Sequence, residues 1–155
     1  MKFYDIDQNY ITYLKTIDNQ IPDIKYITNN KFVCGIVLNM NGIDYYTPVS
    51  HTTQKQRTNL QIFDKGKPIS SIRFSFMFPA MNEVLQIKNF KQIATCDQKY
   101  ADLLNSELQW CIKNEEAIYN KAKSVYNIGC NKNHKLNYAC CDFRKLEENY
   151  KKYLL

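Results

Sequence analysis

The chain has 155 residues, 45% of them hydrophobic, and a formal net charge of +6. This length suits one domain with a real core, residues 1–155, and the composition excludes a disordered chain. No apolar run approaches the roughly 20 residues that span a bilayer, and no secretory signal begins the chain. We therefore expect an intracellular protein, away from membranes, that keeps its six cysteines as reduced thiols.

The chain begins with a predicted strand and a short amphipathic helix. Residues 1–6 alternate loosely in polarity, as a half-buried strand does. Asp7 can cap a helix after them. One face of this helix gathers Tyr10, Tyr13, Leu14 and Ile17. The simple interpretation of the tyrosines is core packing.

A β-hairpin dominates the first half of the chain. Residues 32–40 are rich in Val and Ile, residues 43–47 return, and Asn41-Gly42 between them suits the positive φ angles of a type I′ turn. Pro48 has no N–H to donate, so strand pairing should stop there. The polar loop that follows would therefore be exposed at the end of a rigid hairpin.

This loop concentrates side chains that can do chemistry. Within eight residues it offers an imidazole, three hydroxyls and two cations: Ser50, His51, Thr52, Thr53, Lys55 and Arg57. Loops held by a rigid scaffold are where binding and catalytic groups are usually placed. The alternative is an ordinary loop with solvated charges, and composition alone favours that alternative.

Most of the net charge follows directly after the hairpin. From residue 55 to residue 91 the chain has seven cations and two carboxylates, which supplies +5 of the +6. The cations are Lys55, Arg57, Lys65, Lys67, Arg73, Lys88 and Lys91. Such a stretch raises the local concentration of polyanions such as nucleic acid. A modest basic excess is also common in proteins that bind no nucleic acid, so the signal is weak by itself.

The remaining strands favour an α+β fold. Short strands are predicted over residues 59–63, 69–77 and 84–87, with a glycine turn over 64–68. Arg73 would point away from the core, toward a ligand. Because strands come first and helices after, we expect a mainly antiparallel sheet.

The C-terminal part is predicted to be helical. Thr95 and Gln98 have the spacing of a capping box and would begin one long helix that Gly129 ends. The apolar stripe of this helix is Tyr100, Leu104, Leu108, Cys111, Ile118, Ala122 and Val125. Asp142 would cap a last helix. Its apolar face is Phe143, Leu146, Tyr150, Tyr153 and Leu154.

One group of residues raises the question of a metal: Cys130, His134, Cys140 and Cys141. The spacing C-x3-H-x5-C-C matches no common zinc pattern, and adjacent cysteines ligate one ion awkwardly. A structural loop between two helices is the better interpretation, so no metal site is predicted. A zinc-stabilised structural protein remains a distant alternative.

Several kinds of active site are missing. The sequence has no glycine-rich phosphate loop, no carboxylate cluster for Mg²⁺ and no H-E-x-x-H motif. A serine triad could draw only on His51 or His134. An enzyme built from this chain would therefore work without metal or cofactor. RNA cleavage meets that condition because the 2′-OH of the substrate attacks the adjacent phosphate. The protein needs only to move protons and stabilise the phosphorane.

A series of short segments, in order along nearly the whole chain, is similar to one protein family. The segments are residues 1–4, 9–14, 29–38, 45–50, 69–79, 108–111 and 141–147. They resemble the ToxN/AbiQ toxins of type III toxin–antitoxin systems, and we take the CptN branch as the nearest. The ordered series carries the resemblance, since no single motif in it is highly specific.

The resemblance implies what composition cannot. Members of the family are metal-independent endoribonucleases without cofactors, built on a strongly twisted antiparallel sheet or partial barrel like that of MazF/Kid toxins. An N-terminal helix and C-terminal helices pack on that sheet. The proteins cut A-rich RNA and leave 2′,3′-cyclic phosphates. They process a repetitive precursor into a small pseudoknotted RNA antitoxin, which inhibits them in a closed assembly with two or three copies of each partner. The implied setting is phage defence in the bacterial cytoplasm.

The catalytic loop of the family, Pro-Leu-(Ser/Thr)-Ser-Pro-Lys, is only partly matched here. Residues 48–50 agree with it, but His51 stands at the key Ser, Thr52 at the second Pro and Thr53 at the Lys. Lys55 lies two positions further on. This departure keeps a second function open, an RNA-binding module of the same fold without turnover.

The resemblance and the loop chemistry together suggest a set of catalytic residues: Tyr10, Lys31, Ser50, His51, Thr52, Thr53 and Lys55. His51 would move a proton, a lysine would stabilise the phosphorane, and the hydroxyls would hold the phosphate. Tyr10 and Lys31 enter because they match family positions. Tyr26 is a second tyrosine match, and we assign it to RNA binding together with the seven cations between residues 55 and 91.

Overall fold

The computed structural model describes residues 1–23 and 31–155, with a β-hairpin at its centre. In this hairpin β2 (Val33–Met40) and β3 (Ile43–Ser50) pair antiparallel across a two-residue turn. Asn41 and Gly42 of the turn have φ angles of 53° and 83°. Both values are positive, as a type I′ turn requires, so the predicted turn is confirmed.

The hairpin is the middle of an antiparallel sheet. In the described part of the chain this sheet has seven strands, in the order β4-β5-β3-β2-β1-β7, with β6 added to β3. The other strands are β1 (Lys2–Ile6), β4 (Asn59–Asp64), β5 (Lys67–Arg73), β6 (Phe78–Pro79) and β7 (Leu85–Ile87). The sheet is followed by helices, so the predicted α+β class is confirmed.

β3 changes its partner at Pro48. Up to this residue β3 pairs with β2, where Pro48 faces Val33. The two residues after it pair with β5, and Ser50 faces Ser71. The prediction that pairing stops at Pro48 is therefore correct for β2 and wrong for the strand as a whole. The N–H of Val49 still donates to the C=O of Phe32 at 3.2 Å, so the change of partner follows from the arrival of β5 and not from the missing N–H of Pro48.

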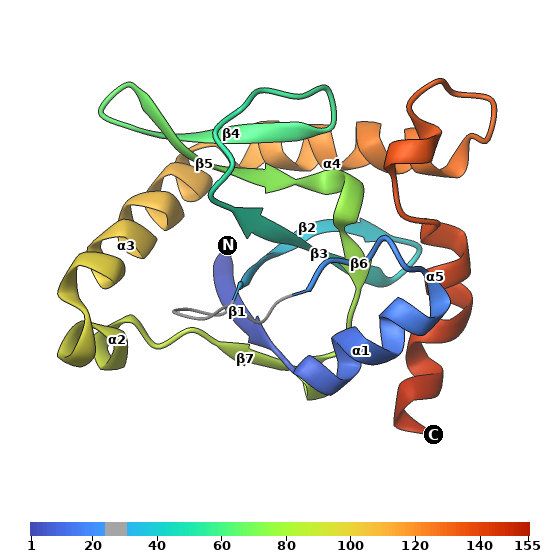
Figure 1. Cartoon of the computed structure of the whole chain (residues 1–155), viewed down its shortest axis with the longest axis horizontal. Helices are drawn as coiled ribbons and strands as arrows, with labels where there is room; N and C mark the ends of the chain where they lie inside the picture. The colour runs from blue at the N-terminus through green and yellow to red at the C-terminus, as the bar shows by residue number, and fades with distance from the viewer. Residues whose placement is uncertain (24–30) are drawn as a thin grey trace.

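Helices flank the sheet on two sides (Figure 1). α3 (Gln98–Lys113) and α4 (Glu115–Cys130) lie along the β4–β5 hairpin, and both contact β4. α1 (Gln8–Ile17) packs against α5 (Phe143–Asn149) on the other side, and α2 (Phe90–Cys96) leads into α3. No helix among the described residues is long and apolar enough to cross a bilayer.

Both helix caps predicted at aspartates are present. Asp7 accepts a hydrogen bond from the backbone N–H two residues on, at 2.9 Å, and Asp142 accepts one from the N–H three residues on, at 3.2 Å. After α5 the chain tightens into a 3-10 turn, η4 (Tyr150–Leu154). Leu154 is 51% exposed, so its predicted place on the apolar face is wrong.

The single long helix predicted for the C-terminal part is also wrong. Thr95 lies inside α2, and Asp97 caps α3 instead by accepting from the N–H of Tyr100 at 3.0 Å. α3 and α4 are separated at Asn114, whose side chain donates to the C=O of Trp110 at 2.8 Å and so competes with the helix backbone. The apolar stripe is nevertheless buried on both sides of this break at Leu104, Cys111, Ile118, Ala122 and Val125. Hydrophobic spacing alone therefore could not place the break.

Gly129 lies inside α4 rather than after its end, because the helix continues to Cys130. A Cβ atom at Gly129 would lie 2.2 Å from Cε2 of Phe143. The glycine is therefore required by the close approach of α5, not by a positive φ angle at a helix end.

The strand predicted over residues 69–77 ends early. β5 stops at Arg73, and the chain continues as a 3-10 turn, η1 (Phe74–Phe76), before β6. Phe74 is fully buried and Phe76 packs against the core. Alternating apolar residues thus continue through a turn that the sequence pattern does not reveal.

Candidate functional site

The polar loop predicted from the sequence occupies residues 51–58, between β3 and β4. At its start the hydroxyl of Ser50 donates to Oγ1 of Thr52 at 3.2 Å. The same Ser50 oxygen accepts from the backbone N–H of Thr52 at 3.3 Å. Both side chains are half-buried, and His51 between them is exposed. The structure therefore brings a hydroxyl pair and an imidazole together at the end of β3.

Asn59 and Gln61, at the start of β4, brace this loop. Oδ1 of Asn59 accepts from the N–H of Gln56 and Nδ2 donates to the C=O of Gln54, both at 2.9 Å. Nε2 of Gln61 donates to the C=O of Thr53 at 2.7 Å. Asn59 is 3% exposed, so its role is internal. The sequence analysis missed both residues. The available signal was an Asn directly after a polar loop, since Asn side chains readily bond nearby backbone.

Two cations of the loop line a cavity with residues that are distant in sequence. Lys55 and Arg57 meet Lys121 of α4 and His134 at a hollow of about 680 Å³. Nδ1 of His134 accepts from the N–H of Leu136 at 3.0 Å, so a neutral ring carries its proton on Nε2. None of the described Asp and Glu residues lines the cavity. The sequence analysis did not predict Lys121, and it considered His134 only as a metal ligand or a triad member.

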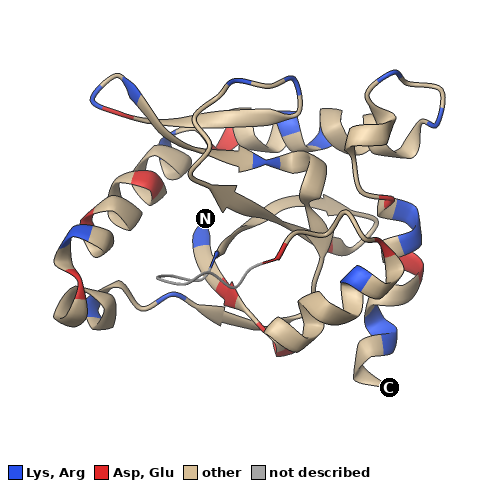
Figure 2. Ribbon diagram, in the orientation of Figure 1, with Lys and Arg blue, Asp and Glu red and all other residues tan. Residues whose placement is uncertain are grey.

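Several cations from separate segments lie on the side of the molecule that holds the loop, although others lie on α1, α2 and α5 (Figure 2). Figure 2 shows Lys and Arg on the loop after β3, on the β4–β5 turn, on α4 and on the segment after α4, all along the upper edge of the view. Segments far apart in the sequence thus present cations to the same region. Tertiary packing extends the basic stretch predicted from residues 55–91.

Lys31 lies two residues before β2, at the same end of the hairpin as Ser50. The C=O of Phe32 accepts from the N–H of Val49 at 3.2 Å. In an antiparallel pair the residue before Phe32 lies level with the residue after Val49. Continued by two residues, this register places the backbone of Lys31 beside that of Ser50.

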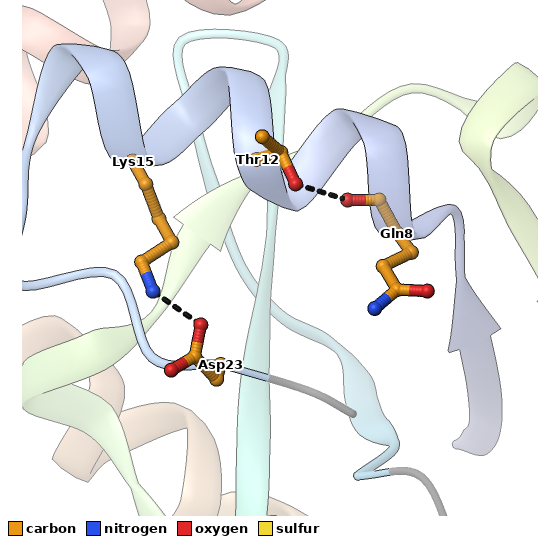
Figure 3. Close-up of polar contacts among 4 residues, drawn as sticks. All are labelled: Gln8, Thr12, Lys15 and Asp23. Carbon is orange, nitrogen blue, oxygen red and sulfur yellow. Dashed lines mark hydrogen bonds and ion pairs between the residues drawn. The ribbon is translucent and has the colours of Figure 1, made fainter. Parts of the chain in front are cut away.

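The charge of Lys31 also acts on Asp23, which follows α1. Asp23 forms an ion pair with Lys15 of α1 (Figure 3). The pKa of Asp23 is lowered, first by the hydrogen bond from Lys15 and to a smaller extent by the positive charge of Lys31. Tyr26 lies outside the described residues.

Of the residues predicted for the site, Tyr10 is buried in the core and Lys88 is held in an ion pair. Tyr10 has no exposed surface, and its hydroxyl donates to the C=O of Pro79 at 2.6 Å. Burial raises its pKa well above the usual value. The Lys88 side chain is 7% exposed, pairs with Asp5 at 2.9 Å and lies over the ring of Phe32. Tyr10 is not presented to a ligand, so core packing is its correct interpretation. Lys88 is held by its ion pair with Asp5, although it also lines a hollow of about 530 Å³.

The other predicted cations are spread over the surface. Lys65 and Lys67 are exposed on the β4–β5 turn, and Lys91 is exposed on α2, far from the loop in Figure 1. Arg73 is half-buried, and its guanidinium lies 4.6 Å from the centre of the Phe76 ring. Arg73 therefore points neither fully outward, as predicted, nor into the core.

The cysteine cluster is not arranged as a metal site. In residues 1–23 and 31–155 no three His, Cys, Asp or Glu side chains are grouped so that they could hold an ion. Cys130, Cys140 and Cys141 are free thiols, and the Cys141 N–H donates to the C=O of Ser75 at 2.8 Å. The zinc-stabilised alternative therefore has no ligand set in this part of the chain.

Comparison with known proteins gives a consistent result. A sequence model of the family described as Toxin ToxN, type III toxin-antitoxin system, matches residues 2–151. The chain is 26% identical over 162 residues to Endoribonuclease ToxN of Bacillus thuringiensis subsp. kurstaki, covering 98% of this chain and 84% of that protein. It is 27% identical over 163 residues to Endoribonuclease ToxN of Pectobacterium atrosepticum, covering 97% of this chain and 92% of that one.

Solved structures are similar in fold. One concerns a bacterial type III toxin–antitoxin system with selective toxin inhibition by a non-coding RNA pseudoknot. It matches with a TM-score of 0.90 and 26% identity, over 99% of this chain and 97% of its own. A second, from a bacterial antiviral system regulated by a processed non-coding RNA, has a TM-score of 0.85 at 24% identity and covers 98% of each chain. AbiQ, a lactococcal anti-phage endoribonuclease, has a TM-score of 0.83 at 22% identity, over 99% of this chain and 97% of its own.

Proposed function

The chain belongs to the ToxN family of type III toxin–antitoxin toxins, and from this premise we propose that it is an endoribonuclease that needs no metal ion. The 2′-OH of the substrate attacks the adjacent phosphate, the 5′-oxygen leaves with a proton, and the products are a 2′,3′-cyclic phosphate and a 5′-OH. Relatives that share 26–27% of their residues with this chain are named endoribonucleases.

The observation that supports this function best is the braced loop after β3. Ser50 and Thr52 form a half-buried hydroxyl pair beside the exposed imidazole of His51. In the proposed mechanism His51 moves a proton, and the hydroxyls of Ser50, Thr52 and Thr53 bind the scissile phosphate. Lys55 or Lys31 stabilises the charge of the phosphorane, where a desolvated charge-assisted contact typically contributes about 1.5–3 kcal/mol. Tyr10 is omitted because it is buried.

The proposal extends to substrate and partner. The substrate is A-rich RNA, and the partner is a pseudoknotted RNA antitoxin that the protein cuts from a repetitive precursor. The two form a closed assembly with two or three copies of each in the bacterial cytoplasm, and the role is phage defence. Support comes from relatives of the same fold, described with a non-coding RNA pseudoknot, a processed non-coding RNA or anti-phage activity. Placement in the CptN branch and likeness of the sheet to the MazF/Kid barrel are parts of the same proposal.

The first test is growth arrest. Induction of the wild-type chain in bacteria should stop growth, and His51→Ala or Lys55→Ala should relieve the arrest. Lys113→Ala is the matched control, since Lys113 is an exposed cation at the end of α3 that lines neither the loop nor its cavity. If both loop variants remain as toxic as the control, the assigned site is wrong.

The second test separates an enzyme from a binding module. Purified protein, freed of RNA, is incubated with A-rich RNA and EDTA, and the product ends are analysed. Cleavage with 2′,3′-cyclic phosphate ends supports the proposed function. Tight binding with intact RNA supports the alternative, an RNA-binding module in which His51 has replaced a family catalytic Ser.

A further inference from the structure

Tyr138 is the most exposed aromatic side chain of the described residues, at 78%. It lies in the 3-10 turn η3 (Asn137–Ala139), between α4 and α5. A single exposed aromatic residue needs no explanation by itself. Two further features distinguish Tyr138: its turn is fixed by hydrogen bonds, and a cavity lies beside it.

The turn is fixed to the body of the protein on both sides. Nδ2 of Asn137 donates to the C=O groups of Ile128 and Gly129, both at 3.0 Å. Just after the turn, the N–H of Cys141 donates to the C=O of Ser75 at 2.8 Å. Tyr138 is therefore presented from an anchored backbone, which reduces the entropy lost when a ligand packs against it.

The ring lies at a cavity of about 550 Å³ that adjoins the loop of the proposed active site. Arg57 and Arg73 line this cavity together with Tyr138 and Phe76. Arg57 also lines the neighbouring cavity of about 680 Å³, which contains Lys55, Lys121 and His134. Within residues 1–23 and 31–155, no Asp or Glu lines either cavity. The two hollows share Gln56, Arg57 and Leu136 in their lining, so they adjoin each other, and together we call them the cationic path from the loop to the tyrosine.

We propose that this path binds a single strand of RNA next to the cleavage site and that Tyr138 stacks on one of its unpaired bases. Phosphates of the strand would lie near Arg57, and the planar ring of Tyr138 would cover a base. Stacking on an aromatic side chain requires a base that is not paired, so the proposal specifies a single strand rather than a duplex. The inference rests on the proposed function for its ligand, RNA, but it assigns a residue that the catalytic loop does not contain.

The test uses a fluorescent probe that cannot be cleaved. The probe is a set of 2′-O-methyl oligoadenylates of about eight nucleotides, a usual site size for single strands, with 2-aminopurine at successive positions. At one position the fluorescence should be quenched on binding because the base stacks on Tyr138. Tyr138→Phe should retain the quenching and the affinity, since the ring remains. Tyr138→Ala should lose the quenching and bind about 5- to 150-fold more weakly, the usual effect of losing one base–aromatic stack.

The control is Tyr119→Ala, because Tyr119 is 40% exposed on α4 but lines neither cavity. This variant should bind the probe as the wild type does. Unchanged quenching and affinity in Tyr138→Ala overturn the inference, and so does a wild type that does not bind the probe. If natural RNA is cleaved but Tyr138→Ala binds normally, the proposed function stands and the stacking site fails. If Tyr138→Ala abolishes the quenching of the probe but the wild type never cleaves RNA, the stacking site stands and the proposed function fails.

Discussion

Replacing Asn59 by Ala should impair the proposed catalytic loop more than it unfolds the protein. Asn59 makes two hydrogen bonds of 2.9 Å to the loop backbone, at Gln54 and Gln56, and is 3% exposed. Each such bond contributes about 1 kcal/mol, so the loop loses roughly 2 kcal/mol of its preference for the observed shape. If that preference is needed only in the transition state, kcat falls by up to about 30-fold.

The measurement is the cleavage rate of A-rich RNA at saturating concentration, together with the free energy of unfolding in urea. Asn39→Ala is the matched control. The side chain of Asn39 also makes two hydrogen bonds, to the N–H of Gly42 at 3.2 Å and to Asp44 at 2.6 Å, but it braces the β2–β3 turn at the far end of the hairpin. This variant should lose some stability and keep the wild-type kcat.

Two results would refute the reasoning about Asn59. One is an Asn59→Ala protein that is less stable but cleaves RNA at the wild-type rate, because the loop would then not depend on its brace. The other is an equal loss of kcat in Asn39→Ala, because the effect would then reflect general destabilisation.

Three further predictions concern pH, packing and salt. Burial raises the pKa of Glu107 from 4.5 to about 7, against a smaller opposite effect of the hydrogen bond from Ser70. The folded state therefore holds this proton more tightly than the unfolded state, and the free energy of unfolding should fall as pH rises from about 4.5 to 7, by roughly 3 kcal/mol. Glu107→Gln should flatten this dependence and the exposed control Glu148→Gln should not; a similar slope in all three proteins contradicts the assignment. Gly129→Ala should lower the unfolding free energy by about 1–3 kcal/mol, because its Cβ would lie 2.2 Å from the ring of Phe143. The control is Asn120→Ala at an exposed site of α4, and equal melting temperatures would show that α5 can move aside. Finally, log affinity for RNA should fall linearly with log salt, and Lys55→Ala should reduce the slope by about 1 if Lys55 contacts a phosphate; a flat response would mean that base contacts and shape dominate.

Local patterns were sufficient for several elements of this fold. Asn41-Gly42 predicted a turn with two positive φ angles, and Asp7 and Asp142 predicted two helix starts. Each depends on a few neighbouring residues whose side chains and φ angles act on the adjacent backbone, so a single sequence is enough to find them. The ordered resemblance along the chain was sufficient for the family.

Other features depend on residues that meet only in the folded chain. Gly129 was interpreted as a helix end, yet its small size serves the packing of Phe143. Lys88 carries a charge that the sequence assigns to RNA binding, but its amine pairs with Asp5 and lies over the ring of Phe32. The sequence around Gly129 is compatible with a helix end and with close packing, and that around Lys88 with a solvated cation and with an ion-paired one.

By itself, then, the sequence determined the hairpin, the helix caps, the α+β class and the loop that holds Ser50 and His51, because these are properties of short stretches of chain. Only the tertiary structure decided that Asn59 braces this loop and that Lys121, His134 and Tyr138 line the adjoining cavities. The physical reason is that a cavity is made by side chains from separate elements, and their distances are set by the packing of α4 and α5 against the sheet.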